Sequence, residues 1–165
     1  MVVGKRITSL NFKELVVLSG IFIRHPLYLF PTYKATDRTV KISNRLYGQL
    51  HHKDNRTNAF RHALWNYLIC KYCLSIAGSM EKAVNWSKKI TDLHERLSPN
   101  AGLAKAMDLH NNRIGRELFL NSFGKYENVV PLLVQKTNAA VKVRIVREIE
   151  EVREKLVYIE DVRSL

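Results

Sequence analysis

Cysteine, proline and glycine are scarce in this 165-residue sequence, which contains two, four and seven of them. Few prolines and glycines, together with an ordinary hydrophobic content of 46%, disfavour a disordered chain. The two cysteines, Cys70 and Cys73, form a CxxC pair, and no second pair is present to complete a four-Cys zinc site. They lie in the apolar run WNYLICKYCL, on one side of a helix. This pattern predicts buried core thiols rather than a redox pair.

Long apolar runs are also missing. The run LVVLSGIFI near the N-terminus is too short to span a bilayer. It is followed by Arg24-His25-Pro26 instead of a small-residue cleavage site, which disfavours a secretory signal. We therefore expect a cytoplasmic protein, or one exported without a classical signal peptide.

Acidic residues are few: 15 Asp and Glu stand against 27 Lys and Arg, which gives a formal net charge of +12. Such an excess predicts attraction to anionic partners. Nucleic acid, an acidic membrane surface and a phosphorylated substrate all fit the charge equally well.

What the sequence does have is helical periodicity. It predicts one all-α domain over residues 1–165, a compact bundle of about five to seven helices. The segment HPLYLFPTYK is expected to be an irregular connector. We expect QLHHKDNRTN to be a polar loop with His51 and His52 at the surface, and LVYIEDV to be a short strand or an extended tail. The expected helices cover about 11–24, 35–47, 57–77, 80–97 and 101–123, with one or two more in the tail.

The helix near 57–77 carries an unusual mixed face. Drawn at 100° per residue, this face combines large apolar residues with a histidine and amides. Buried hydrogen-bonding groups need partners, so His62 is either a site residue or a core histidine with its hydrogen bonds satisfied. The face comprises Asn58, His62, Trp65, Ile69 and Cys73, with Arg61 and Asn66 at its margins.

On the next helix, His94 lies at the edge of the apolar stripe, whereas Glu95 points away from it in a regular helix. We therefore expect His94 rather than Glu95 to face inward. Glu95 is expected to pair with a basic residue or to meet a neighbouring segment. The stripe comprises Ala83, Trp86, Ile90, Leu93 and Leu97.

The helix over 101–123 places His110 on its apolar stripe and Asp108 on a polar strip with Asn111 and Asn112. Asp108 and His110 are about 160° apart around a regular helix, so they cannot both face one small site. Gly115 lies in the helix interior, where glycine costs about 1 kcal/mol relative to alanine. A close approach of backbone or ligand would explain it.

Three motifs, NAFRHALWN, LHE and MDLHNNRIGRE, occur in this order between about residues 55 and 117. In combination they resemble a bacterial domain family of uncharacterised activity, with DAFRHAYWN-like and MDLHNN-x-VGR-like motifs. Its members are often found at the C-terminal end of large secreted or toxin-like proteins. The resemblance implies that Glu95 belongs to the site and that the protein is a toxin-like effector. Asn58 stands where the family motif has an acidic residue, which puts an acid–base role for that position in doubt.

These residues admit two hydrolytic mechanisms. In one, His62 and His94, with Asp108 or His110, bind a divalent metal ion that activates water. In the other, a histidine oriented by Asp108 acts as general base, and cationic and amide groups stabilise an anion. The candidate catalytic residues are His62, His94, Asp108, Arg61, Asn111, Asn112, Glu95 and His110.

The sequence thus predicts a hydrolase acting on a phosphoester or an acyl ester. The alternative is a non-enzymatic basic module that binds nucleic acid or an acidic membrane, and a third interpretation gives the polar residues a purely structural role. A concave pocket lined by His62, His94 and Asp108 together would favour the enzyme. Histidines each paired to backbone in a closed core would contradict it.

Overall fold

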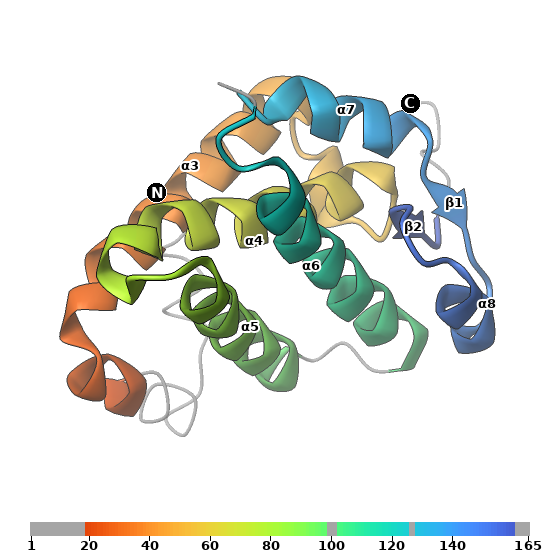
Figure 1. The fold of residues 1–165 in the computed structure, drawn as a ribbon. Helices are drawn as coiled ribbons and strands as arrows, with labels where there is room; N and C mark the ends of the chain where they lie inside the picture. Colours follow the sequence, from red (N-terminus) through yellow and green to blue (C-terminus); the bar gives the residue numbers. More distant parts are fainter. Residues whose placement is uncertain (1–18, 99–101, 126–127, 161–165) are drawn as a thin grey trace.

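Helix α4 (Arg56–Ala77) is the centre of the structure, a computed structural model that describes residues 19–98, 102–125 and 128–160. Buried residues make up 14 of its 22 positions, and it contacts α3, α5, α6 and α7. A helix that is buried on most sides has to be enclosed by other helices. In Figure 1, α5 and α6 lie next to each other and both cross α4.

The described part of the chain is mostly helical, with seven α-helices, five of them of seven or more residues. Two short 3-10 helices, η1 and η2, are additional. The predicted all-α bundle with a short C-terminal strand is therefore confirmed. Residues 19–24 are helical. The remaining elements are η1 (Pro26–Tyr28), α3 (Leu29–Tyr47), η2 (Leu50–His52), α4 (Arg56–Ala77), α5 (Met80–Leu97), α6 (Gly102–Ser122), α7 (Val130–Asn138), β1 (Val141–Lys142), α8 (Val146–Glu151) and β2 (Val157–Tyr158).

The two strands form a small parallel sheet near the C-terminus. Val141 lies opposite Val157, and Lys142 lies opposite Tyr158. The other edge of β2 faces α6, so the C-terminal segment is attached to the helical bundle (Figure 1). None of the helices in the described ranges is both long and apolar enough to cross a membrane.

Helix α3 begins earlier than its sequence suggests. The expectation of an irregular connector was wrong from Leu29 onward, because Pro31 lies in the first turn of the helix. In that turn a backbone N–H has no partner within the helix, so proline is tolerated. Residues 11–18 of the expected first helix lie outside the described residues, whereas 19–24 are helical as expected.

The core confirms one prediction about side chains and corrects another. Cys70 and Cys73 are fully buried, and burial raises the pKa of their thiols to about 12 and about 11. They are therefore core thiols that stay protonated near neutral pH. The expectation of a surface pair at His51 and His52 was wrong for His51, which is buried and bonded through Nε2 to Asn44 Oδ1 at 2.8 Å.

Candidate active site

Three buried polar strips meet where α4, α5 and α6 pack together. Each strip follows the i, i+4, i+8 spacing that aligns side chains along one side of a helix. All nine side chains are buried, so each strip has to find its hydrogen-bond partners on the other two. The strips are Asn58, His62 and Asn66 on α4, Ser87, Thr91 and Glu95 on α5, and Asp108, Asn112 and Arg116 on α6.

A close approach of α4 and α6 makes this meeting possible. A Cβ atom on Gly115 would lie 2.7 Å from the Cα of Ala63 and closer still to its carbonyl oxygen. Only glycine fits such a contact, so the predicted close approach at Gly115 is confirmed as one of backbone to backbone. Next to this contact, His62 on α4 faces Asn112 on α6.

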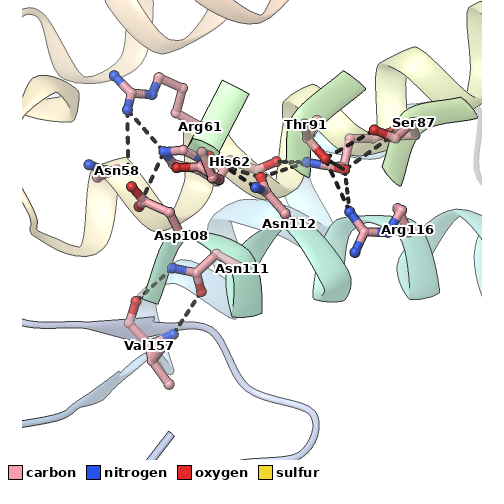
Figure 2. A network of polar contacts seen from close by, with 12 residues as sticks. Asn58, Arg61, His62, Ser87, Thr91, Asp108, Asn111, Asn112, Arg116 and Val157 are labelled. Atoms are coloured by element: carbon pink, nitrogen blue, oxygen red, sulfur yellow. Dashed lines mark hydrogen bonds and ion pairs between the residues drawn. The ribbon is translucent and has the colours of Figure 1, made fainter. Parts of the chain in front are cut away.

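The ionisable groups at one end of the strips are His62, Glu95 and Asp108, here called the His62 cluster. Candidate ligand atoms of the three residues all lie within 4.8 Å of one another. The Nε2 atom of His62 is 3.3 Å from Asp108 Oδ1, and its Nδ1 atom is 3.7 Å from Glu95 Oε1. The imidazole ring therefore has a carboxylate near each nitrogen, and Figure 2 shows the one of Asp108.

The neighbouring network determines which nitrogen of His62 carries the hydrogen. The guanidinium of Arg116 can only donate, so the Asn66 atom that it contacts at 2.8 Å is the amide oxygen. Asn66 Nδ2 then donates to Asn112 Oδ1 at 2.6 Å, and Asn112 Nδ2 donates to Glu95 Oε1 at 3.2 Å. Asn112 Oδ1 can only accept, and it lies 3.1 Å from His62 Nδ1. Nδ1 is thus the N–H donor, which leaves Nε2 as the basic nitrogen of the neutral ring.

Ser87 and Thr91 reinforce this chain of contacts. Both hydroxyls donate to Asn66 Oδ1, at 2.9 and 3.1 Å. With Arg116, three donors converge on one amide oxygen, which holds the Asn66 side chain in a single orientation. Figure 2 shows Ser87, Thr91 and Arg116 on the same side of the network.

The network that holds the carboxyl groups of Glu95 and Asp108 also contains the guanidinium groups of Arg61 and Arg116. Buried charges are tolerated when they are paired and hydrogen-bonded. A neutral ring whose Nε2 accepts from Arg61, and can take up a proton when that guanidinium moves, is the form that a general base requires.

Arg61 lies at the outer end of the cluster, where the side chain is only half-buried. Its Nη2 atom is 3.0 Å from His62 Nε2 and 3.4 Å from Asn58 Oδ1, so the guanidinium covers the basic nitrogen (Figure 2). Close by, burial raises the pKa of Asp54, and the charges of Asp108 and Glu160 raise it further. The rim thus combines a cation with carboxyl groups.

The expectation that His94 rather than Glu95 faces inward was wrong. Glu95 is 1% exposed and belongs to the cluster, whereas His94 is half-buried and packs its ring edge-on against Trp65, 5.1 Å between centroids. The apolar stripe of α5 marks only one of its two buried sides. The other side is the polar strip with Ser87 and Thr91, which packs between α4 and α6.

Asn111 and His110 lie on other sides of α6 and hold the C-terminal segment. Asn111 Nδ2 donates to Val157 O at 2.9 Å, and Val157 N donates to Asn111 Oδ1 at 3.0 Å. His110 Nε2 contacts Lys155 O at 2.9 Å, and burial lowers the pKa of this histidine. As the helix geometry predicts, Asp108 and His110 do not share a site.

A metal site remains compatible with the donor chemistry, although with a different ligand set. One imidazole nitrogen and two carboxylate oxygens suit a divalent cation, and they come from His62, Glu95 and Asp108 rather than from His94. Arg61 Nη2 lies where a cation at Nε2 would be repelled, so the guanidinium has to move for metal to bind there.

Four members of the network were missed as site residues: Asn66, Ser87, Thr91 and Arg116. A search for polar residues at i, i+4 and i+8 on all three helices would have found them. One helix alone does not contain this signal, because a single polar strip is also typical of a solvent-exposed side. Only the presence of such a strip on all three helices indicates that the strips face one another.

No curated protein and no solved structure is similar enough to the chain to be matched to it. A family match does exist, and it covers α3 to α7 together with all three polar strips. The chain belongs to the family described as Domain of unknown function (DUF6973), which matches residues 19–141.

Proposed function

We propose that the His62 cluster is the active site of a hydrolase in which His62 is the general base. The observation that supports this most directly is the orientation of the ring. The contacts of Asn112 leave Nε2 basic, and Nε2 faces the half-exposed end of the cluster beside Arg61 and Asp108. A structural histidine would gain nothing from directing its basic nitrogen toward Arg61, which is half-exposed.

In the proposed reaction, Nε2 of His62 takes a proton from a water molecule as the water oxygen bonds to the phosphorus or carbonyl carbon. The proton on Nε2 is then stabilised by Asp108, and Glu95 faces the opposite side of the ring. The bond to the leaving group breaks, and the protonated His62 returns the proton to the departing oxygen. General base catalysis of this kind contributes about 100- to 10,000-fold.

Arg61 is proposed to bind the anionic part of the substrate. The cluster is nearly closed to solvent, so a substrate has to displace this guanidinium from Nε2. A phosphate or an acyl oxyanion would attract it outward and expose the base at the same time. The charge of +12 agrees with an anionic substrate.

A metal-dependent form of this hydrolase is the alternative mechanism. His62, Glu95 and Asp108 would hold the ion, which would supply a more acidic bound water and a positive charge near the developing anion. Metal content of the purified protein distinguishes the two: about one equivalent of a divalent ion retained after dialysis supports this form.

The motif resemblance supports a biological setting for the proposed enzyme, namely a bacterial toxin or effector. The competing proposal is a non-enzymatic basic module that binds nucleic acid or an acidic membrane, and the net charge favours it. The hydrolase needs the Asp108 carboxylate for its activity even when the protein is folded. The binding module needs only the folded, basic surface.

The test compares wild type with Asp108→Asn and Arg61→Gln. Hydrolysis is measured with para-nitrophenyl phosphate, bis-para-nitrophenyl phosphate and para-nitrophenyl acetate, and toxicity by colony counts after expression in bacteria. We expect Asp108→Asn to lower kcat about 100-fold or more, because the protonated ring loses its carboxylate partner. Arg61→Gln should raise KM about tenfold, because it removes one charge-assisted contact to the anion.

Asp37→Asn is the matched control, since Asp37 lies on α3, takes no part in the polar strips and pairs with Lys41. Because Asp108 is buried, circular dichroism has to establish that its variant is folded. The half-exposed Arg61 provides a variant with little risk to folding. Folded Asp108→Asn and Arg61→Gln proteins with wild-type hydrolysis and wild-type toxicity would overturn the catalytic proposal and favour the binding module.

A further inference from the structure

A concave region lies between α3, α4 and the start of α7, on a different side of α4 from the polar strips. It has a volume of about 220 Å³. Ile42, Leu64, Leu68 and Val129 supply an apolar lining. None of its lining residues takes part in the polar strips.

Three cations line this cavity: Arg38 and Arg45 from α3, and Lys71 from α4. All three are exposed, and none is paired with a carboxylate from the described ranges. Helix α3 has a single acidic residue, Asp37, which bonds to Lys41 at 2.7 Å. The positive charge at the cavity is therefore not neutralised by the helix that supplies most of it.

The geometry of α3 explains why the charges converge. Arg38, Ile42 and Arg45 follow the i, i+4, i+7 spacing, so the two guanidinium stems lie on one side of the helix with an apolar residue between them. Lys71 approaches from α4 across the cavity. A fourth cation, Lys34, lies over the ring of Tyr72, 5.2 Å from its centroid, and Tyr72 itself lines the cavity.

Helix α7 adds to the positive potential. Asn128, Val129 and Val130 line the cavity, and the nine-residue helix begins at Val130. The N-terminal end of a helix carries a partial positive charge of about half a unit. Asn128 Oδ1 already accepts the Val130 N–H at 3.0 Å, so the helix contributes mainly through its field.

We propose that this cavity binds a phosphate group. Arginines around a concave surface, with no carboxylate partner within the described ranges, match a multiply charged oxyanion, which guanidinium groups bind in bidentate fashion. The volume is below the range of about 300–1,000 Å³ that is usual for sites of drug-sized ligands. The cavity therefore accommodates a compact anion, and the rest of a larger ligand lies outside it. The phosphate can come from a small molecule or from a lipid headgroup.

The experiment is a titration of the full chain, followed by ¹⁵N NMR, with inorganic phosphate and pyrophosphate. A parallel arm measures sedimentation with vesicles of phosphatidylcholine containing or lacking phosphatidic acid. The variants are Arg38→Gln, Arg45→Gln and Lys71→Gln, and Arg144→Gln is the control because Arg144 is exposed and remote from the cavity. All four residues are exposed, so folding should be unaffected.

We expect shifts concentrated on the amides of Lys71, Asn128 and Val130. Each arginine variant should weaken binding about tenfold, whereas Arg144→Gln should have no effect. Binding of the soluble anions alone identifies a small-molecule site, and additional binding of phosphatidic acid vesicles identifies a headgroup site. Binding of neither probe, or binding that Arg144→Gln weakens as much as Arg38→Gln, would overturn the proposal. The outcome is independent of the hydrolase test, since the two sites share no residue.

Discussion

His51 is a buried histidine whose protonation is opposed by folding. Burial lowers its pKa to about 4 from 6.5, and the nearby charges of His52 and Arg61 act in the same direction. A histidine that binds its proton more weakly in the folded state stabilises the fold only while it is neutral. Its contribution is thus present above pH 6.5 and is lost as the pH falls from 6.5 toward 4.

We predict that the free energy of unfolding decreases by about 3 kcal/mol at most through this one group over that interval. Urea unfolding at pH 7, 5.5 and 4.5 measures the decrease. His51→Gln should make the pH dependence shallower, although His110, whose pKa is also lowered by burial, contributes in the same sense. An unchanged pH dependence in the variant would contradict the assignment to His51.

Single residues also mark the limit of what the sequence could predict. The sequence indicates His62 and Asp108 as site candidates for two reasons. His62 lies on a helix face that mixes apolar and polar residues, and both residues belong to motifs that resemble those of a family. Glu95 was expected to point outward because the apolar stripe of α5 indicates only one of the two buried sides of that helix. Its position depends on two other helices, and the periodicity of one helix contains no information about them.

At the scale of helices, the spacing between α4 and α6 depends on Gly115. An added Cβ would meet backbone atoms of Ala63, which cannot rotate away as a side chain would. The helices would have to separate, and the contacts of His62 with Asn112 would lengthen with them.

We therefore predict that Gly115→Ala lowers the free energy of unfolding by about 3 kcal/mol and Tm by about 10 °C, from overpacking at a rigid contact. Gly20→Ala is a matched control, because Gly20 is also helical and an added Cβ there meets nothing within 4 Å. The control should be neutral or slightly stabilising. Thermal unfolding followed by circular dichroism measures both, and equal Tm values for the two variants would contradict the close-contact argument.

The helices themselves were largely predictable, since α4, α5 and α6 begin and end within two residues of their expected bounds. Asn55 and Ser79 cap α4 and α5 with side chains that accept backbone N–H bonds, a start signal that the helical periodicity does not contain. The start of α3 was not, because two prolines suggested a break where one of them fits the first helical turn.

At the scale of the whole molecule, the C-terminal segment connects distant parts of the chain. The side chain of Asn111 pairs with both backbone groups of Val157 and so occupies the edge of β2 as a third strand would. Beyond β2, the amides of Ile159 and Glu160 both donate to Asp54 O at 2.9 Å. Sequence periodicity could suggest a strand here but not its partner, because strands of two residues carry no pairing signal.

We predict that Asn111→Ala lowers the free energy of unfolding by about 3 kcal/mol, since it leaves two buried backbone groups of Val157 without partners. Hydrogen exchange should accelerate at Val141 and Val143, which donate to the segment around β2, while α4 remains protected. Asn121→Ala, at an exposed position of the same helix, is the control. Wild-type exchange at Val141 in the Asn111 variant would contradict this role.

The attachment of the C-terminal segment also has a consequence for biosynthesis. Arg56 donates to Tyr158 Oη across 102 residues of sequence, and Asp54, two residues before α4 begins, receives two further bonds from the same segment. On the ribosome, the three crossing helices can pack while the chain is still growing. The rim beside Arg61 and Asp108, in contrast, is completed only after residue 160 has emerged. If the cluster is catalytic, a partly synthesised chain is therefore inactive, and activity begins only with chains whose synthesis has passed that point.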